Sequence, residues 1–385
     1  MEGETQKIKF YWGAATSAHQ VEGGNRNDWT EWERERGIEQ SGRACDHYNR
    51  FLEDFDIARS LGHNAHRFSI EWSRIEPEEG KFDEREIQHY RDVIAALRER
   101  GLEPFVTLWH WTAPLWFRDK GGWANKKSPE YFARYVECVV SAFGGSTSKL
   151  EVEPPLVKYW ITLNETNVYT GHGYWKGNWP PGKRSLLRYI VANHRLSQAH
   201  IAAYKTIKKI NPAAEVGVAH NVVWFTKRFS RTKKFVWNNL FIRSIRNFQD
   251  FVGINYYFSD WTTKEKTDIG WPIDPEGLYY VLKDASRYKK PIFIFENGIA
   301  DARDEKRATF IKDHVAAMHR AMNEGLPAQA GVDVRGYFYW SLLDNFEWDK
   351  GFTPRFGLVE MDYKTTERRI RKSAFVYRGI IERGL

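Results

Sequence analysis

Short apolar runs alternate with longer amphipathic segments along the whole chain. The apolar runs are rich in β-branched and aromatic residues, which is typical of buried strands. The amphipathic segments repeat apolar residues every three or four positions, as helices with one buried face do. The pattern predicts strands at residues 10–14, 65–70, 103–108, 159–163, 215–219, 251–254, 292–295 and 334–339. It predicts helices at residues 46–61, 83–100, 129–143, 185–210, 232–245, 276–288, 305–323 and 373–382.

Eight strand–helix units in succession predict the fold. Strands that alternate with helices form a parallel sheet with the helices outside it. Eight such units favour an α/β fold that closes into a single (β/α)8 TIM barrel, with residues 1–385 as one catalytic domain. An open doubly wound sheet is disfavoured, since no glycine-rich dinucleotide fingerprint follows the first strand. No linker divides the chain, and we expect residues 144–155 to form a surface excursion.

Two of the predicted strands end on a carboxylate. The strand at 159–163 runs into Asn164 and Glu165, and the strand at 292–295 runs into Glu296. The two glutamates are 131 positions apart, so only a closed tertiary structure brings them together. Paired this way they indicate acid–base and nucleophilic chemistry on a glycosidic bond. For either glutamate alone, an unrelated surface ion pair is the simpler interpretation.

Polar or aromatic residues occupy the same end of most of the other predicted strands. In (β/α)8 barrels the chemistry lies on this rim. Taken singly, each residue has a structural explanation: a core histidine, a surface ion pair or barrel packing. Their coincidence at one rim favours a site. The residues, in chain order, are Gln20, Arg67, His110, Trp111, Asn255, Tyr257, Trp340, Glu347 and Trp348.

Composition and charge narrow the class of protein. The chain contains 17 Trp residues, and tryptophan stacks well on the apolar face of a sugar ring. The net charge of +8 is compatible with a polyanionic partner. However, Lys and Arg are interleaved with Asp and Glu, and the dense cluster at 227–234 lies in no nucleic-acid-binding motif. We therefore expect a solvated basic surface and no nucleic-acid partner.

Cysteine usage and the N-terminal residues bear on location. Cys45 and Cys138 lie in helical patterns without metal-ligand spacing, so we expect buried free thiols in a reducing compartment. The first nine residues are polar and lack the apolar core of a signal peptide. No apolar run is long enough to span a bilayer. The sequence therefore predicts a cytoplasmic protein without a membrane span.

The ordered motifs resemble glycoside hydrolase family 1, the β-glucosidase and β-galactosidase family, from end to end. A lone Asn-Glu or Glu-Asn-Gly is weak support, but the whole set in this order is specific. The motifs lie at residues 10–16, 20–23, 67–74, 107–111, 162–165, 253–257, 295–298 and 336–348.

The resemblance implies a role for each candidate residue. Glu296 matches the nucleophile and Glu165 the general acid/base. The residues that match the substrate-binding positions are Gln20, His110, Trp111, Asn164, Tyr257, Trp340, Glu347, Trp348 and Phe356. Arg67 and Asn255 match supporting positions. The implied activity is retaining hydrolysis of unphosphorylated β-D-glucosides, galactosides or fucosides, with a small-molecule glycoside or oligosaccharide as the partner. No cofactor and no metal are implied.

The implied mechanism needs one ionised and one protonated carboxyl about 5–5.5 Å apart. We expect Arg67 and Tyr257 to favour ionised Glu296, and the charge of Glu296 to keep Glu165 protonated.

Two departures from the family pattern are visible. Thr166 stands where many members have proline, and residues 220–251 leave room for little more than one helix, so any lid there is reduced and we expect an open aglycone site. The alternatives are a non-catalytic carbohydrate-binding barrel, a 6-phospho-β-glycosidase and a transglycosylase. The preferred sugar, the aglycone and the oligomeric state do not follow from the sequence.

Overall fold

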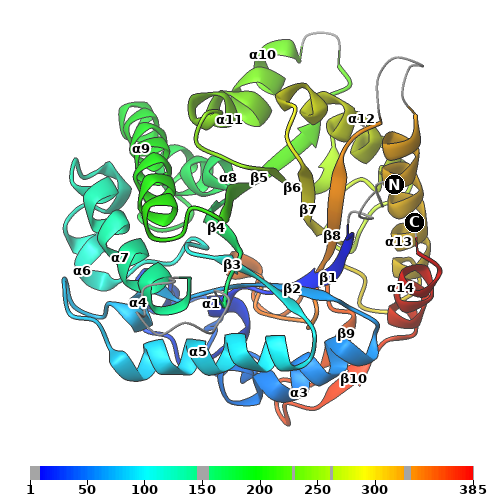
Figure 1. Ribbon diagram of the computed structural model, residues 1–385, viewed down its shortest axis with the longest axis horizontal. Helices are drawn as coiled ribbons and strands as arrows, with labels where there is room; N and C mark the ends of the chain where they lie inside the picture. Colours follow the sequence, from blue (N-terminus) through cyan, green and yellow to red (C-terminus); the bar gives the residue numbers. More distant parts are fainter. Residues whose placement is uncertain (1–8, 145–155, 228–229, 261–262, 325–330, 385) are drawn as a thin grey trace, which may run out of the picture.

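The computed structural model describes residues 9–144, 156–227, 230–260, 263–324 and 331–384. Eight parallel strands form a closed barrel in chain order, with β8 paired to β1, and helices surround it (Figure 1). The (β/α)8 fold is therefore confirmed. The strands are β1 (Tyr11–Ala15), β2 (Ala65–Ser69), β3 (Glu103–Thr107), β4 (Tyr159–Asn164), β5 (Glu215–Trp224), β6 (Val252–Ser259), β7 (Ile292–Asn297) and β8 (Val334–Trp340).

Helices follow each strand of the barrel. The outer helices are α3 (His47–Ser60), α5 (Glu84–Glu99), α7 (Ser128–Phe143), α9 (Leu186–Ile210), α11 (Leu240–Ile245), α12 (Pro275–Ala285), α13 (Arg307–Asn323) and α14 (Lys372–Arg383). Shorter helices are α1 (Ala18–Val21), α2 (Asp28–Arg36), α4 (Trp72–Ile75), α6 (Leu115–Asp119), α8 (Thr166–Thr170) and α10 (Arg231–Lys234). Among the described residues, no helix is both long enough and apolar enough to cross a membrane.

Irregular turns complete the chain path. The 3-10 turns are η1 (Gly122–Ala124), η4 (Ser286–Tyr288) and η5 (Trp348–Lys350), and the π-helical turns are η2 (Gly171–Lys176) and η3 (Phe235–Asn239). A hairpin of β9 (Val359–Met361) and β10 (Arg368–Ile370) follows β8.

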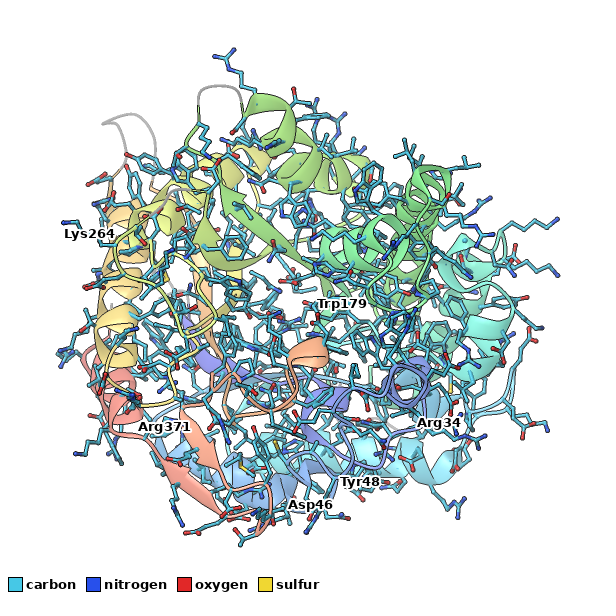
Figure 2. The ribbon with its side chains drawn as sticks, turned by 180° about the vertical axis from the view of Figure 1, so that it is seen from behind. Arg34, Asp46, Tyr48, Trp179, Lys264 and Arg371 are labelled. Carbon is cyan, nitrogen blue, oxygen red and sulfur yellow. The ribbon has the colours of Figure 1, made fainter. Side chains whose placement is uncertain are left out.

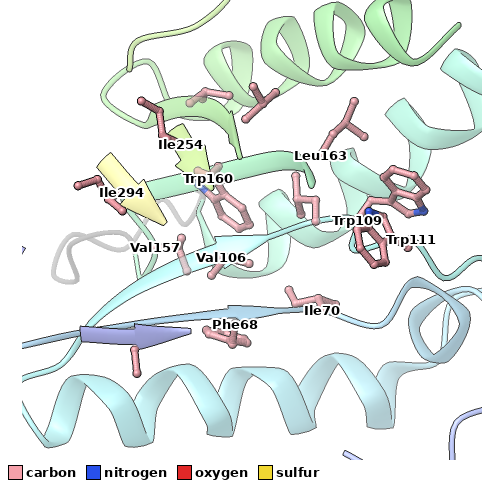
Figure 3. Close-up of a cluster of buried hydrophobic side chains, with 14 of the residues drawn as sticks. Phe68, Ile70, Val106, Trp109, Trp111, Val157, Trp160, Leu163, Ile254 and Ile294 are labelled. Atoms are coloured by element: carbon pink, nitrogen blue, oxygen red, sulfur yellow. The ribbon is translucent and has the colours of Figure 1, made fainter. Parts of the chain in front are cut away.

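Two apolar layers hold the barrel together. Aromatic rings such as Phe105, Tyr159 and Phe293 fill its interior, with Phe105 and Tyr159 stacked at 4.2 Å between ring centroids. The alternate residues of the same strands point outward and pack beneath the helices (Figure 3). On β4, for example, Tyr159 faces inward and Trp160 faces outward, as the period of two in a strand requires.

The inward–outward alternation shifts by one residue near the carboxyl ends of several strands. On β7, Phe293 and Phe295 both face inward, so strict alternation would point Glu296 outward. A register shift between Ile294 and Asn297 re-aims Glu296 into the barrel mouth. On β4 a shift between Ile161 and Asn164 places Leu163 in the outer layer and turns Asn164 inward. These irregularities deliver polar side chains to the site.

Several predicted boundaries were wrong. β5 and β6 each extend five residues beyond the predicted ends at 219 and 254. The helix predicted at 232–245 is interrupted by the π-helical turn η3. The helix predicted to begin at residue 129 begins at Ser128, and Lys127 precedes it without a side-chain cap. Of the predicted surface excursion at 144–155, residues 145–155 lie outside the described residues.

The two cysteines only partly match the prediction. Both are free, but Cys45 lies in a turn before α3 rather than in a helix. Cys45 is buried, and burial raises the pKa of its thiol well above the ordinary value. Cys138, on α7, is only half-buried, so the expected pair of buried thiols is wrong for this residue.

Candidate active site

A pocket of about 300 Å³ lies at the carboxyl end of the barrel strands. Its floor and walls contain ten of the eleven residues predicted for catalysis or substrate binding. These are Gln20, His110, Trp111, Glu165, Tyr257, Glu296, Trp340, Glu347, Trp348 and Phe356. Trp179, which also lines the pocket, lies near the centre of the face shown in Figure 2. The barrel therefore brings together, in one concave surface, residues that lie as many as 336 positions apart in the chain.

Glu296 is buried and held at both carboxylate oxygens. Arg67 donates to its Oε1 at 2.5 Å, and the Tyr257 hydroxyl donates to its Oε2 at 2.6 Å. Burial raises the pKa of Glu296 above its ordinary value, while Arg67 and Tyr257 act to lower it. The expected influence of these two groups is thus present, but desolvation outweighs it and the net shift of the pKa is upward.

Glu165 has a different set of partners. Its backbone is in the left-handed region at φ 43°, directly before α8. Two amides, Asn255 at 2.9 Å and Asn221 at 3.1 Å, both donate to its Oε1. Because Oε1 accepts two N–H groups, the proton of the neutral acid belongs on Oε2.

The pKa of Glu165 is raised to about 8, first by burial and second by the charge of Glu296. The prediction attributed this shift to Glu296 alone, whereas loss of solvent is the larger cause. At neutral pH the carboxyl group of Glu165 therefore carries a proton, while Glu296 is the carboxyl paired with a guanidinium.

A polar network beneath the pocket fixes the orientation of these groups. The amide oxygen of Asn164 accepts from Arg67 at 2.7 Å and from Asn255 at 3.1 Å. The amide nitrogen of Asn164 then donates to Nε2 of His110 at 3.1 Å. Burial and the charge of Arg67 lower the pKa of His110 well below its ordinary value, so the ring is neutral and carries its proton on Nδ1. Asn164, Arg67 and Asn255 lie under the pocket rather than on its surface.

Another part of the pocket lining combines one carboxyl group with aromatic rings. Burial raises the pKa of Glu347 to about 8, and the charge of Glu296 adds to that rise. Gln20 donates to Oε2 of Glu347 at 3.3 Å. The ring of Trp348 lies 4.7 Å from that of Trp111 between centroids. This part of the lining is mostly apolar with a few directed polar groups, which suits a sugar ring.

Sequence reasoning missed part of the pocket. Asn221 and Trp237 both line it, and the Trp237 indole donates to the Asn221 amide oxygen at 3.0 Å. Asn221 lies on the unpredicted extension of β5, and Trp237 lies in η3. Lys176 and Trp271 are further lining residues outside the recognised motifs. Asn221 could have been found from the sequence as a polar residue that follows the apolar run of a predicted strand and continues that strand.

The departure at Thr166 leaves the geometry of Glu165 intact. Thr166 begins α8, and the Thr170 hydroxyl donates to its carbonyl at 2.7 Å. Glu165 lines the pocket with threonine after it. Among the described residues, no cluster of three or more His, Cys, Asp or Glu side chains is arranged to hold a metal ion.

Comparison with known proteins places this site in a family. The sequence profile described as Glycosyl hydrolase family 1 matches residues 4–237 and 262–384. Beta-glucosidase A of Thermotoga maritima is 33% identical, over 97% of each chain. The solved beta-glycosidase from Pyrococcus horikoshii superposes with a TM-score of 0.87 and 37% identity, over 97% of this chain and 93% of that one. A 6-phospho-beta-galactosidase of Staphylococcus epidermidis is 29% identical, over 97% of each chain.

The interruption of the profile match at 238–261 covers the second half of the connection from β5 to β6 and β6 itself. The sequence predicts a reduced lid in that connection. The match includes every residue predicted for the site except Asn255 and Tyr257, which lie in the interruption. The chain belongs to glycosyl hydrolase family 1 and is a β-glycosidase that acts on O-glycosyl bonds.

Proposed function

We propose that the protein hydrolyses unphosphorylated β-D-glycosides with retention of configuration, through a covalent glycosyl-enzyme. Glu296 is the nucleophile and Glu165 the general acid/base. The observation that carries this proposal is the contrast between the two carboxyl groups in one pocket: Glu296 is paired with Arg67, and Glu165 is bonded only to amides.

The closeness of the two carboxyl groups supports retention. Both line the same pocket, and Asn255, which pairs with Glu296 between β6 and β7, donates to Oε1 of Glu165 at 2.9 Å. We therefore expect the spacing of about 5–5.5 Å that retaining enzymes use. Inverting enzymes need about 6.5–9.5 Å to admit a water between the carboxyl groups.

The proposed reaction has two steps. Glu165 gives its proton to the glycosidic oxygen as the C1–O bond breaks, and Glu296 Oε attacks C1 to form the glycosyl ester. Glycosylation removes the charge of Glu296, which lowers the pKa of Glu165. Glu165 then takes a proton from water, and the water attacks C1 and releases Glu296.

The remaining lining residues match a sugar ring. His110 is neutral, and its Nδ1 has no hydrogen-bond partner among the described residues, so it is available to a hydroxyl. Trp340 lines the pocket with its indole nearly parallel to the His110 ring. Gln20, Trp111, Glu347, Trp348 and Phe356 are proposed to position the hydroxyls and faces of the ring. Asn164, which lies beneath the pocket surface, is proposed to act on the sugar through His110, to which its amide nitrogen donates.

The 6-phospho-β-glycosidase alternative depends on Glu347. When Glu347 is ionised, one unit of like charge at roughly 4 Å and an effective dielectric near 20 costs about 4 kcal/mol. That is on the order of a thousandfold in kcat/KM. The pKa of Glu347 is raised to about 8, so at neutral pH most molecules avoid this penalty. Lys350, which also lines the pocket, offsets part of the remainder.

A pH series with two substrates tests the proposal. We expect kcat/KM for an aryl β-glucoside or β-galactoside to exceed that for its 6-phosphate, by a small factor at neutral pH and by up to about a thousandfold once Glu347 is ionised. The ratio should grow as pH rises through about 8, because Glu347 loses its proton there. Glu347→Gln should remove that growth. Equal values at a pH where Glu347 is ionised, or a preference for the phosphate at any pH, would show that Glu347 does not face the substrate in this way.

A further inference from the structure

Charge is distributed very unevenly along this chain. Residues 166–249 contain fifteen Lys and Arg and a single acidic residue, Glu215, so their net charge is +14. The rest of the chain carries −6, which gives the overall +8. The even interleaving of charges expected from the sequence is therefore wrong for this stretch. In the described part of the stretch, only Lys208 and Lys234 form ion pairs, with Asp250 and Asp284.

Exposed apolar side chains are concentrated in the same stretch. Leu186, Leu187 and Ile190 lie on the first two turns of α9, and Leu187 is 71% exposed. Trp175, which is 53% exposed, lies beside them, with its ring 6.0 Å from that of Tyr189. A second group on η3 and α11 consists of Phe235, Val236 and Leu240. Monomeric proteins seldom gather exposed apolar residues in this way without a binding role.

Both groups border the mouth of the active-site pocket. Lys176 follows Trp175 in η2 and lines the pocket, and Trp237 follows Val236 in η3 and also lines it. The helices α9 and α11 are adjacent in Figure 1 and are joined by a hydrogen bond between Ser197 and Ser244 at 3.0 Å. We call this surface the basic apolar rim. It comprises the seven apolar residues above with the exposed cations Lys176, Lys183, Arg184, Arg188, Arg231 and Lys233.

The chemistry of the rim selects its partner. A second copy docking through the same patch would bring two strongly positive surfaces together, which like-charge repulsion opposes. Nucleic acid would satisfy the cations but not the exposed leucines, isoleucine and valine. An anionic lipid bilayer satisfies both, because apolar side chains enter the acyl boundary while Lys and Arg bind the headgroups.

We propose that the basic apolar rim docks on an anionic lipid bilayer and holds the mouth of the pocket next to it. Surface docking of this kind needs only the exposed rim, and it leaves the barrel and the two glutamates unchanged. It does not depend on which glycoside the pocket accepts.

Vesicle co-sedimentation of the full chain tests the proposal. At low ionic strength we expect binding to vesicles of phosphatidylcholine with phosphatidylglycerol, and much weaker binding to phosphatidylcholine alone. The triple variant K183E/R184E/R188E should lower the partition coefficient at least about a hundredfold, since each cation near an anionic surface contributes roughly a fivefold gain and the added carboxylates are repelled. The matched control R59E/K312E/K372E makes the same change of net charge at exposed, unpaired cations on α3, α13 and α14, and should retain binding.

A second variant separates the apolar contribution. L186S/L187S/I190S should weaken binding most clearly at high salt, where charge attraction is screened. Both rim variants should keep wild-type kcat/KM on a soluble aryl glycoside, which shows that they are folded. The proposal is overturned by three outcomes: no binding to anionic vesicles, equal loss in the rim and control charge variants, or a rim-dependent dimer or DNA complex that forms in preference to vesicle binding.

Discussion

The surroundings of Glu296 and Glu165 differ although both are buried glutamates in the same pocket. A guanidinium and a phenol contact Glu296, and both donate to a negative charge. Two neutral amides contact Glu165, and both donate to the same oxygen. Burial raises the pKa of both groups, so desolvation alone does not distinguish them. In the proposed mechanism the partners decide which carboxyl group ionises first, and therefore which attacks and which protonates.

Of the changes that test this contrast, removing Glu296 should lower activity the most. We expect Glu296→Ala to lower kcat on the order of 10⁵-fold, because no other group can form the glycosyl ester. Added azide should restore turnover and give the α-azide. Circular dichroism should show an intact fold, and Glu360→Ala, at an exposed carboxylate, should keep full activity. A loss of only a few-fold in Glu296→Ala would assign the nucleophile to another residue.

Replacing Glu165 should have a smaller effect that depends on the leaving group. Glu165→Gln removes the proton donor but keeps the shape, so we expect losses of about 10² to 10⁴-fold for alkyl glycosides. Dinitrophenyl glycosides, whose leaving group needs no proton, should form the glycosyl-enzyme at nearly the wild-type rate. Pre-steady-state kinetics with both substrates provides the measurement. Equal losses for the two classes would remove Glu165 from the acid role.

Weakening the amide contacts of Glu165 should have the smallest effect. Asn221 lowers the pKa of Glu165 by its hydrogen bond, so Asn221→Ala should raise that pKa. One such bond is worth about 1 kcal/mol, so the alkaline limb of kcat/KM should move up by about half to one pH unit. Because the acid must be protonated, activity is lost as pH rises through this limb.

Trp237→Phe provides an independent check of the same contact. It removes the indole N–H that holds the Asn221 amide but keeps an aromatic ring, so the limb should move in the same direction by less. If neither variant moves the limb and the losses depend on the aglycone, Asn221 and Trp237 act on aglycone binding instead.

The sequence predicted the presence of the barrel strands better than their ends. β5 and β6 continue past their apolar runs because sheet hydrogen bonds persist while the side chains become polar, as at Asn221 and Asn255. The alternation rule predicts that Glu296 points outward, and only the register shift on β7 reverses this. Such shifts depend on how neighbouring strands pair, which a single strand's sequence does not encode.

Nine of the ten predicted pocket residues lie in the recognised motifs, most of which lie at or shortly after a strand end; Phe356 lies outside them. Trp237 escaped because it lies in a π-helical turn within what appears in the sequence as an ordinary amphipathic helix. The sequence predicted that Arg67 lowers the pKa of Glu296. It did not predict that burial raises this pKa by more, because the burial of a side chain is known only from the folded pocket.

The concentration of positive charge in residues 166–249 makes this molecule an electric dipole as well as a cation. A dipole survives when the net charge is titrated to zero, so the protein at its isoelectric point still aligns in an electric field. Adsorbed on a cation-exchange support, molecules would share one orientation, with the pocket mouth toward the matrix and the β9–β10 hairpin side toward solvent. The matrix would then restrict substrate access to the pocket of the immobilised enzyme. On an anion-exchange support the opposite face of the protein would lie against the matrix.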